Sequence, residues 1–498
     1  MKKQSPLRIL VLSTMLALVC GIALAGPDSD DQKQNKLNEN YDLIKAPTGP
    51  EQQLQQIAPG GGQRGKSGHV KHLPLDNLKA EKFKTDDGKT GWKVKIPGNR
   101  ALATPAVVDG MVYVGGGFGS YEFYAFDADT GRPRWAIKVS DDGPTAAVVS
   151  DGVVAFNTES CTLFVVDAKS GRMLWSQWLG DPLMSQPAIA DGMVFMAYPA
   201  SRTHQLIALG LKDGKEKWKM PIEGDIISAP VVYEDSVYVT TFDGNVYRFR
   251  MNDGKEVWKK DFKATSAPWL YKDQVYVSQR KEGEKRPEEG LLRLDNRKGK
   301  QNQESGAWRN RPAPYLDSEV QKKSRYYSAQ KEDDSSVGFS SAPATAKVGA
   351  AEANVGQSTV RGLWEFQGSR PVIVSGRLFM TQGDEVVALD PDDGDELWTH
   401  DISGDLEKVG GHLAAPPSPA GGTLYLATVT GKVLVLSQRN GKVKDMIDVG
   451  SQMRFQPALS GGRLFAGTTD GVLVSIDLDD RSADGWSMWG GGPGHNGN

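Results

Sequence analysis

A tryptophan that returns about every forty residues is the feature that most constrains the fold of this chain. Trp92, Trp135, Trp175, Trp218 and Trp258 follow one another at intervals of 43, 40, 43 and 40 residues. The text before them is also repeated, as in FYAFDADTGRPRW and LFVVDAKSGRMLW. A period of this length indicates repeated units, each of which buries its apolar faces only against its neighbours.

The repeated unit is predicted to be a four-stranded antiparallel sheet. Alternation such as VVDGMVYV gives a strand, a tight turn and a second strand. The run before Asp-x-x-x-Gly is a third strand, and the tryptophan lies on the fourth. Aspartate caps the turn and glycine adopts its positive φ, while the flat indole packs between neighbouring sheets. Stacking such sheets radially gives a β-propeller.

Eight such units are found, so we predict an all-β, eight-bladed propeller over residues 86–478. The three-strand sets begin near Pro105, Pro144, Pro187, Pro230, Pro268, Pro371, Pro419 and Pro457. The fourth strands carry Trp135, Trp175, Trp218, Trp258, Trp364 and Trp398, and Asp445 stands at the tryptophan position of the seventh. The eighth set lacks a fourth strand. We expect the N-terminal strand with Trp92 to pair with the last blade near Val474, which closes the ring and removes its open edge.

The fifth unit is interrupted after its turn at Gly299, because the next tryptophan strand arrives only at Trp364. We predict an insertion over residues 300–359 within the fifth blade, either a solvated excursion or a partner-binding element. Its candidate binding residues are its aromatic side chains, Trp308, Tyr315, Tyr326, Tyr327 and Phe339. The last residues, 479–498, are expected to be a tail in which Trp486 packs without forming a strand.

The N-terminal 85 residues are predicted to lie outside the propeller. Residues 1–25 combine a basic start, an apolar run and the small-x-small sequence Ala23–Ala25, typical of a secretory signal. This pattern predicts export to the periplasm. We also expect the protein to be a monomer. Residues 26–85 are polar and are predicted to be a disordered tether. The alternative of a lipid anchor at Cys20 is disfavoured by Val19. Beyond the signal only Cys161 remains, which excludes an intramolecular disulfide.

Other short motifs carry no chemistry in their context. Residues 60–67, GGGQRGKS, match the phosphate-loop pattern, but they follow a glutamine-rich run without strand character and precede Gly68 and Pro74. The sequence DPDDGDE at 390–396 resembles a calcium loop, yet it lies in the frame of the blade turns. The six histidines lack metal-ligand spacing, and a formal charge of −3 argues against nucleic acid. We therefore predict no metal site and no catalytic residues.

The repeats, such as ALDPDDGDELW ending at Trp398, resemble those of PQQ-dependent dehydrogenases and of the outer-membrane assembly factor BamB family. The terminal WSMWGGGPGHNG (486–497) is similar to a segment often found near the N-terminus of BamB-like proteins. The resemblance implies a non-catalytic periplasmic scaffold that binds protein partners of the cell envelope, including outer-membrane assembly machinery. The alternative is a PQQ-dependent dehydrogenase. Such enzymes resemble one another in a vicinal cysteine pair and acidic Ca²⁺ ligands, and Cys161 alone cannot supply the pair. Neither PQQ nor calcium is therefore expected.

Overall fold

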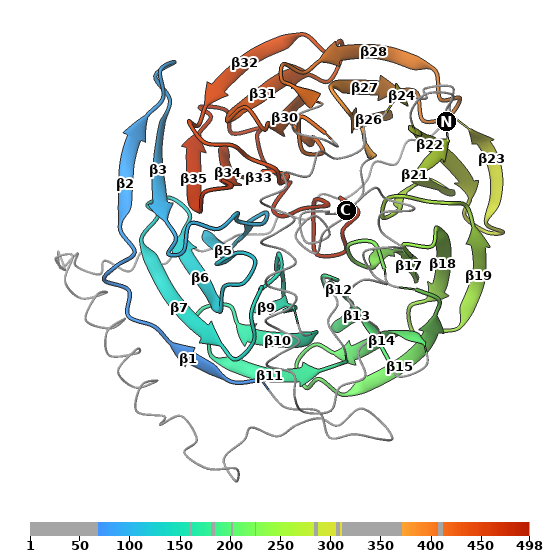
Figure 1. The fold of residues 1–498 in the computed structure, drawn as a ribbon, viewed down its shortest axis with the longest axis horizontal. Coiled ribbons are helices and arrows are strands. Elements are labelled where there is room, and N and C mark those ends of the chain that lie inside the picture. The colour runs from blue at the N-terminus through green and yellow to red at the C-terminus, as the bar shows by residue number, and fades with distance from the viewer. Residues whose placement is uncertain are drawn as a thin grey trace, which may run out of the picture. The chain divides into compact units, whose positions relative to one another are not determined.

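The computed structural model describes residues 68–159, 161–180, 185–200, 203–224, 226–282, 287–304, 309–310, 371–406 and 412–497. These residues form eight antiparallel sheets arranged as blades around a common centre (Figure 1). The predicted eight-bladed, all-β propeller is therefore confirmed. Among the described segments there is no helix with the length and apolar character needed to cross a bilayer.

The first four blades are numbered in chain order, and their strands are given from the centre outward. Blade 1 contains β4 (Ala106–Val108), β5 (Met111–Gly115), β6 (Glu122–Asp127) and β7 (Pro133–Val139), and blade 2 contains β8 (Val148–Ser150), β9 (Val153–Phe156), β10 (Thr162–Asp167) and β11 (Met173–Trp178). Blade 3 contains β12 (Ala188–Ala190), β13 (Met193–Pro199), β14 (His204–Gly210) and β15 (Glu216–Ile222), and blade 4 contains β16 (Val231–Tyr233), β17 (Ser236–Thr240), β18 (Asn245–Arg250) and β19 (Glu256–Asp261).

The other four blades complete the ring. Blade 5 contains β20 (Trp269–Tyr271), β21 (Gln274–Glu282), β22 (Pro287–Asp295) and β23 (Lys300–Glu304), with the short β24 (Arg309–Asn310) also pairing with β22. Blade 6 contains β25 (Val372–Val374), β26 (Arg377–Gln382), β27 (Glu385–Leu389) and β28 (Glu396–Asp401), and blade 7 contains β29 (Ser418–Ala420), β30 (Thr423–Ala427), β31 (Lys432–Ser437) and β32 (Val443–Asp448). Blade 8 contains β33 (Ala458–Ser460), β34 (Arg463–Gly467), β35 (Val472–Asp477) and β3 (Thr90–Lys95).

The repeated tryptophan connects each blade to the turn of the next blade. The Trp135 indole donates a hydrogen bond to the carbonyl oxygen of Ala168 at 3.0 Å. It also covers Gly171, where a Cβ atom would lie 2.8 Å from the ring, so any other residue would push the blades apart. The same indole-to-carbonyl bond is formed in the pairs Trp92–Ala128, Trp175–Leu211, Trp218–Met251, Trp258–Asn296 and Trp398–Gln438.

Two junctions use polar contacts where the others use tryptophan. In blade 5, β23 directly follows the turn at Gly299, and Gln303 takes the tryptophan position opposite Arg293. The Arg293 guanidinium donates to the Pro391 carbonyl oxygen of blade 6 at 3.0 Å. Between blades 7 and 8, Lys89 bonds to Asp445. Both junctions therefore use a cation, Arg293 or Lys89, to connect neighbouring blades whose tryptophan position holds another residue.

The fourth strand of blade 5 corrects the prediction for this unit. We expected the strand only at Trp364 and an insertion beginning at residue 300, but β23 occupies 300–304. Its sequence KQNQE lacks the tryptophan signal. An outermost strand pairs through its backbone and exposes much of its surface to water, so polar residues are tolerated there. Trp364 lies outside the described residues, as do 311–359.

Ring closure occurs as predicted. The N-terminal strand β3 pairs antiparallel with β35, with Trp92 opposite Ser475 and Lys93 opposite Val474. Blade 8 therefore combines strands from both ends of the propeller sequence, and the backbone pairing of β3 removes the edge that β35 would otherwise expose.

The segment 68–85 corrects the predicted tether, because it is ordered on the outer rim. The strand β1 (Val70–His72) pairs with β7 of blade 1, and β2 (Ala80–Lys84) pairs with β3 of blade 8. Both are therefore fifth strands. Short polar strands such as AEKFK lack a full apolar face, yet they gain backbone pairing on an existing edge and half-bury Phe83. The rest of the predicted tether, 26–67, and the predicted signal lie outside the described residues.

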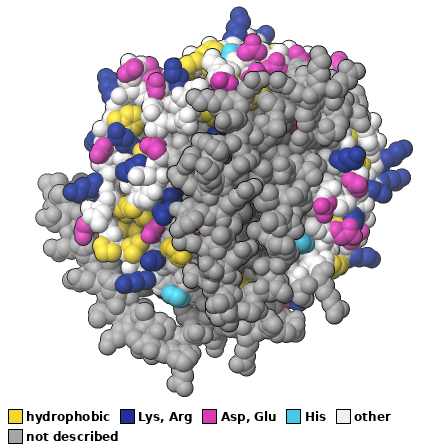
Figure 2. All heavy atoms as spheres, in the orientation of Figure 1, with side chains coloured by type: hydrophobic (Ala, Val, Ile, Leu, Met, Phe, Trp, Pro, Cys, Tyr) yellow, Lys and Arg dark blue, Asp and Glu magenta, His cyan; other side chains and the backbone are white. Residues whose placement is uncertain are grey.

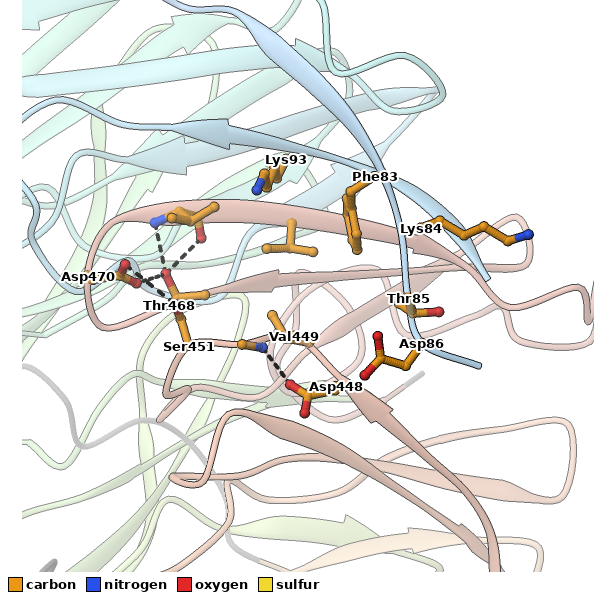
Figure 3. Close-up of a pocket in the computed structure, with 13 residues that line it drawn as sticks. Phe83, Lys84, Thr85, Asp86, Lys93, Asp448, Val449, Ser451, Thr468 and Asp470 are labelled. Carbon is orange, nitrogen blue, oxygen red and sulfur yellow. Dashed lines mark hydrogen bonds between the residues drawn. The ribbon is translucent and has the colours of Figure 1, made fainter. Parts of the chain in front are cut away.

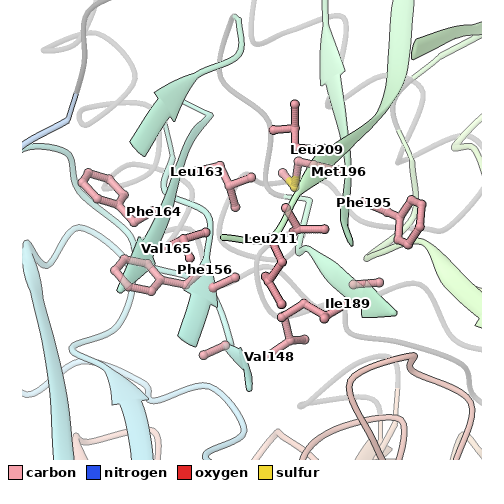
Figure 4. Packing of buried hydrophobic residues seen from close by; sticks show 14 of the residues in the cluster. Val148, Phe156, Leu163, Phe164, Val165, Ile189, Phe195, Met196, Leu209 and Leu211 are labelled. Carbon is pink, nitrogen blue, oxygen red and sulfur yellow. The ribbon is translucent and has the colours of Figure 1, made fainter. Parts of the chain in front are cut away.

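Packing between blades supplies the core. In blades 1 and 2, Phe123 stacks on Phe156 with ring centroids 4.3 Å apart, and Phe156 stacks on Phe164 at 5.5 Å. Figure 4 shows Leu163 and Val165 of blade 2 beside Met196 and Leu209 of blade 3. Adjacent sheets thus bury their apolar faces against each other, as the repeat period requires.

Candidate functional site

The C-terminal segment 486–497, which we call the plug, lies at the centre of the ring (Figure 1). It accepts hydrogen bonds from the innermost strands of blades 8, 1, 3, 4 and 5. The donor N–H groups and acceptors are Leu459 to Trp486 O, Val107 to Ser487 O, Ile189 to Pro493 O, Val232 to Gly494 O and Leu270 to Asn496 Oδ1. Four backbone carbonyl groups and the Asn496 side chain therefore satisfy inner-strand donors that the ladders leave unpaired.

Aromatic and glycine residues fit the plug into this narrow space. Trp486 stacks on Trp269 of blade 5, with ring centroids 5.9 Å apart and an interplanar angle of 12°. Trp489 stacks on His495 at 3.9 Å. Gly490 has a φ of 72°, and a Cβ atom there would lie 2.8 Å from the His495 Cα atom. The many glycines of WGGGPGHNG are therefore explained by a backbone that folds back closely on itself, which leaves no room for side chains.

His495 is fully buried in the plug. Its Nε2 atom lies 2.7 Å from the Pro187 carbonyl oxygen and its Nδ1 atom 3.3 Å from the Trp489 carbonyl oxygen. Burial lowers the pKa of His495 to about 4, although both carbonyl oxygens favour the protonated form. A neutral imidazole has one N–H and can donate to one of the two carbonyl groups.

Acidification is expected to destabilise the wild-type protein more than the His495→Gln variant. Unfolded histidine titrates near 6.5 and folded His495 near 4, so the unfolded chain binds the extra proton first. The stability that the neutral buried ring contributes is present above pH 6.5 and falls as the pH drops toward 4, by up to about 3 kcal/mol. Urea unfolding midpoints of both proteins at pH 7.5 and 5.0 measure this difference. An equal pH dependence of the two would contradict it.

A cleft of about 480 Å³ lies on the rim, at the junction of blades 7 and 8 (Figure 3). One wall is the end of β2 and its turn, with Phe83 and Asp86. The opposite wall is the end of β32 and the loop after it, with Asp448 and Val449. Val474 of β35 also lines the cleft. The cleft therefore presents apolar side chains edged by carboxylates, at one of the two junctions without a tryptophan.

Salt bridges fix the surroundings of the cleft. At its edge, Lys89 bonds to both Asp445 and Asp87. Burial lowers the pKa of Lys89, but these two carboxylates outweigh it and the net pKa is raised. For Asp470, burial raises the pKa, but the Thr468 hydroxyl and the Lys95 charge outweigh it and lower the net pKa. The Lys89–Asp445 pair therefore links the turn between β2 and β3 to β32.

The outer rim also carries exposed apolar side chains. They are Tyr121, Val257, Leu397, Val443 and Met446, each 42–48% exposed. Val443 and Met446 both lie on β32, next to the cleft. Figure 2 shows cationic and anionic side chains interspersed over the described part of the visible face. Mixed charge of this kind gives no field that would steer a polyanion.

The sequence-predicted residues have two different outcomes. Trp92, Trp135, Trp175, Trp218, Trp258 and Trp398 all lie at blade junctions, where they pack and bond as structural residues. The candidate binding residues Trp308, Tyr315, Tyr326, Tyr327 and Phe339 lie outside the described residues, so their role stays a prediction. Sequence reasoning missed the plug's contacts, although its glycine and tryptophan content was visible.

A redox or metal site has little support within the described part of the chain. No group of three metal-ligating side chains converges there. Cys161, the single cysteine beyond the predicted signal, is buried. A small ligand of a propeller would need the central channel or another concave site. At the centre of this ring lies the plug, with Trp489 and His495 buried.

Comparison with known proteins places this geometry in a family. The family model described as outer membrane protein assembly factor BamB matches residues 79–305 and 382–490. The factor of that name from Nitrosomonas eutropha is 27% identical over 213 residues, which are 39% of this chain and 49% of the relative. A quinoprotein ethanol dehydrogenase of Pseudomonas aeruginosa is 30% identical over 162 residues, 28% of this chain and 26% of the enzyme.

A solved structure agrees with the fold. BamB from Moraxella catarrhalis superimposes with a TM-score of 0.52 at 13% identity, covering 80% of this chain and 100% of that one. At this identity the likeness shows the propeller fold alone. The chain spans about half the length of the curated relatives it matches.

Proposed function

Because the chain belongs to the family described as outer membrane protein assembly factor BamB, we propose that it is a non-catalytic periplasmic scaffold for protein partners. The partner we propose is outer-membrane assembly machinery. The observation that carries the proposal is the plug, whose residues lie at the ring centre and bond to five blades. With the plug at the centre, the outer rim and the loops between blades offer surfaces that suit a polypeptide partner.

A crosslinking pull-down from the cell envelope tests the scaffold function. Tagged full-length protein, exported by its own N-terminal segment, is expected to retain identified components of the outer-membrane assembly machinery. A tag exported without the propeller is the control. If mass spectrometry finds those components equally in both samples, the proposed partner is wrong.

The dehydrogenase alternative predicts a bound cofactor, which the scaffold does not. Purified protein mixed with PQQ and Ca²⁺ is expected to retain no quinone absorbance after gel filtration and to reduce no dye with ethanol or glucose. The reason is that the stacked rings of the plug residues Trp489 and His495 are buried at the ring centre, where they would exclude a quinone ring from the space they occupy. Retained quinone or substrate-dependent dye reduction would overturn the non-catalytic proposal.

A further inference from the structure

We propose that the cleft between blades 7 and 8 binds an extended partner segment of alternating apolar and basic residues, which adds to β32 as a fifth strand. The inference rests on the proposed protein-binding function and assigns it a site. It is carried by the rim strands, the outer edge of β32, with which no other described strand pairs, the exposed apolar side chains of β32 and the carboxylates of the cleft.

The rim already contains two consecutive fifth strands. On blade 1 the edge of β7 is taken by β1, and on blade 8 the edge of β3 is taken by β2. Blade 7 is the next blade around the ring, and β32 is the outermost of its described strands. A strand added to β32 would continue this outer layer beside β2. Antiparallel addition to an exposed sheet edge is a general mode of peptide recognition.

The edge of β32 carries less protection than those of β15 and β19. Exposed edges are commonly guarded by lysine or proline. Strand β15 contains the protective residues Lys217, Lys219 and Pro221, and strand β19 contains Lys259 and Lys260. The single lysine of β32 is Lys444, whose ammonium reaches back to the Thr423 hydroxyl of its own blade at 2.6 Å. Val443 and Met446 are instead 48% and 46% exposed.

The charges of the cleft specify the partner's chemistry. Asp86 and Asp448 are exposed and form no salt bridge with described residues. Figure 3 shows both carboxylates pointing into the same space, whereas Lys84 extends away from them. The other cleft lysine, Lys93, is paired with Glu81 at 3.7 Å. A lysine or arginine of the partner would complement the two carboxylates, while its apolar side chains would meet Phe83 and Val449.

Fluorescence anisotropy with the full chain and a labelled ten-residue peptide of alternating valine and lysine tests this site. The peptide is expected to bind. A peptide with glutamate in place of lysine is expected to bind weakly because of the two carboxylates, and one with two central prolines is expected not to bind because proline cannot donate to a ladder. Equal binding of the lysine and glutamate peptides would overturn the proposal.

Two pairs of variants localise the binding. Met446→Arg is expected to abolish it, whereas Val257→Arg, at a side chain of equal exposure on β19, leaves it unchanged. Asp86→Asn with Asp448→Asn is expected to weaken it about 5- to 10-fold, whereas Asp129→Asn with Glu256→Gln, both exposed, does not. Melting curves check that all four variants are folded. Equal effects within either pair would overturn the site.

The outcomes separate this inference from the proposed function. If the wild-type chain captures the assembly machinery but the Met446→Arg variant captures it equally well, the cleft is not the site and the scaffold function stands. If the wild-type chain captures nothing beyond the control, the scaffold function itself fails, whatever the peptide does.

Discussion

Truncation of the chain after Asp484 is expected to unfold the propeller at temperatures at which the full chain is folded. The truncation removes the acceptors of five inner-strand N–H groups, and each buried donor left unsatisfied costs about 1–3 kcal/mol. It also removes Trp486 and Trp489, both almost fully buried, and losing a buried tryptophan costs about 3–5 kcal/mol. Together these losses are comparable with the whole stability of a typical domain, about 5–15 kcal/mol.

Thermal melting followed by far-ultraviolet circular dichroism measures the effect of the truncation. The matched control is Trp489→Phe, which keeps the plug's backbone bonds and a stacked ring against His495, and it is expected to melt close to the wild type. A truncated chain that melts at the wild-type temperature would mean that the plug contributes nothing to the ring.

Trp92→Ala is expected to be the most damaging of the single tryptophan substitutions. Trp92 is 2% exposed, donates to the Ala128 carbonyl oxygen at 2.9 Å and covers Gly131 of blade 1. Removing a buried indole costs about 3–5 kcal/mol. Trp92 also lies on β3, the strand that closes the ring against β35. Its loss therefore weakens the attachment of β3, a strand that no short loop connects to its partner β35.

Urea unfolding of Trp92→Ala and Trp398→Ala gives the comparison. Trp398 is only partly buried, its bond to the Gln438 carbonyl oxygen is longer at 3.2 Å, and its strand lies within one continuous blade. We expect its loss to cost less than that of Trp92. If the two variants unfold at the same urea concentration, the loss of a tryptophan on the ring-closing strand β3 is no more destabilising than the loss of one elsewhere.

Much of the fold could be predicted because its signals are local. The Asp-x-x-x-Gly turn and the following tryptophan lie within one hairpin. Trp92 stands at the same spacing, so the number of fourth strands in the sequence predicted that β3 closes the ring against β35. The fourth strand of blade 5 was predicted at the wrong place because Gln303 stands where the other blades have tryptophan, although the backbone pairing of the strand continues. The strands β1 and β2 were missed because three to five polar residues carry no readable alternation.

The candidate site could not be predicted because its parts meet only in the closed ring. Asp86 and Asp448 lie at opposite ends of the sequence and share one cleft. The plug satisfies inner strands through its backbone, and backbone carbonyl groups are the same in every sequence. Its residues were expected to pack as a tail, but no periodicity indicates which five blades they contact.

The strand that seals the ring also sets the order in which the protein can mature. Lys95 pairs with Val472, 377 positions later, so a chain made from its N-terminus must leave β3 without its partner until almost all of it has emerged. Pairing over such a separation is slow to form and leaves strands open to aggregation meanwhile. We therefore expect nascent or partly translocated chains to depend on holding chaperones. We also expect a circular permutant that links the end of the plug to the segment before β1, and so brings β3 close to β35 in sequence, to refold faster than the natural chain.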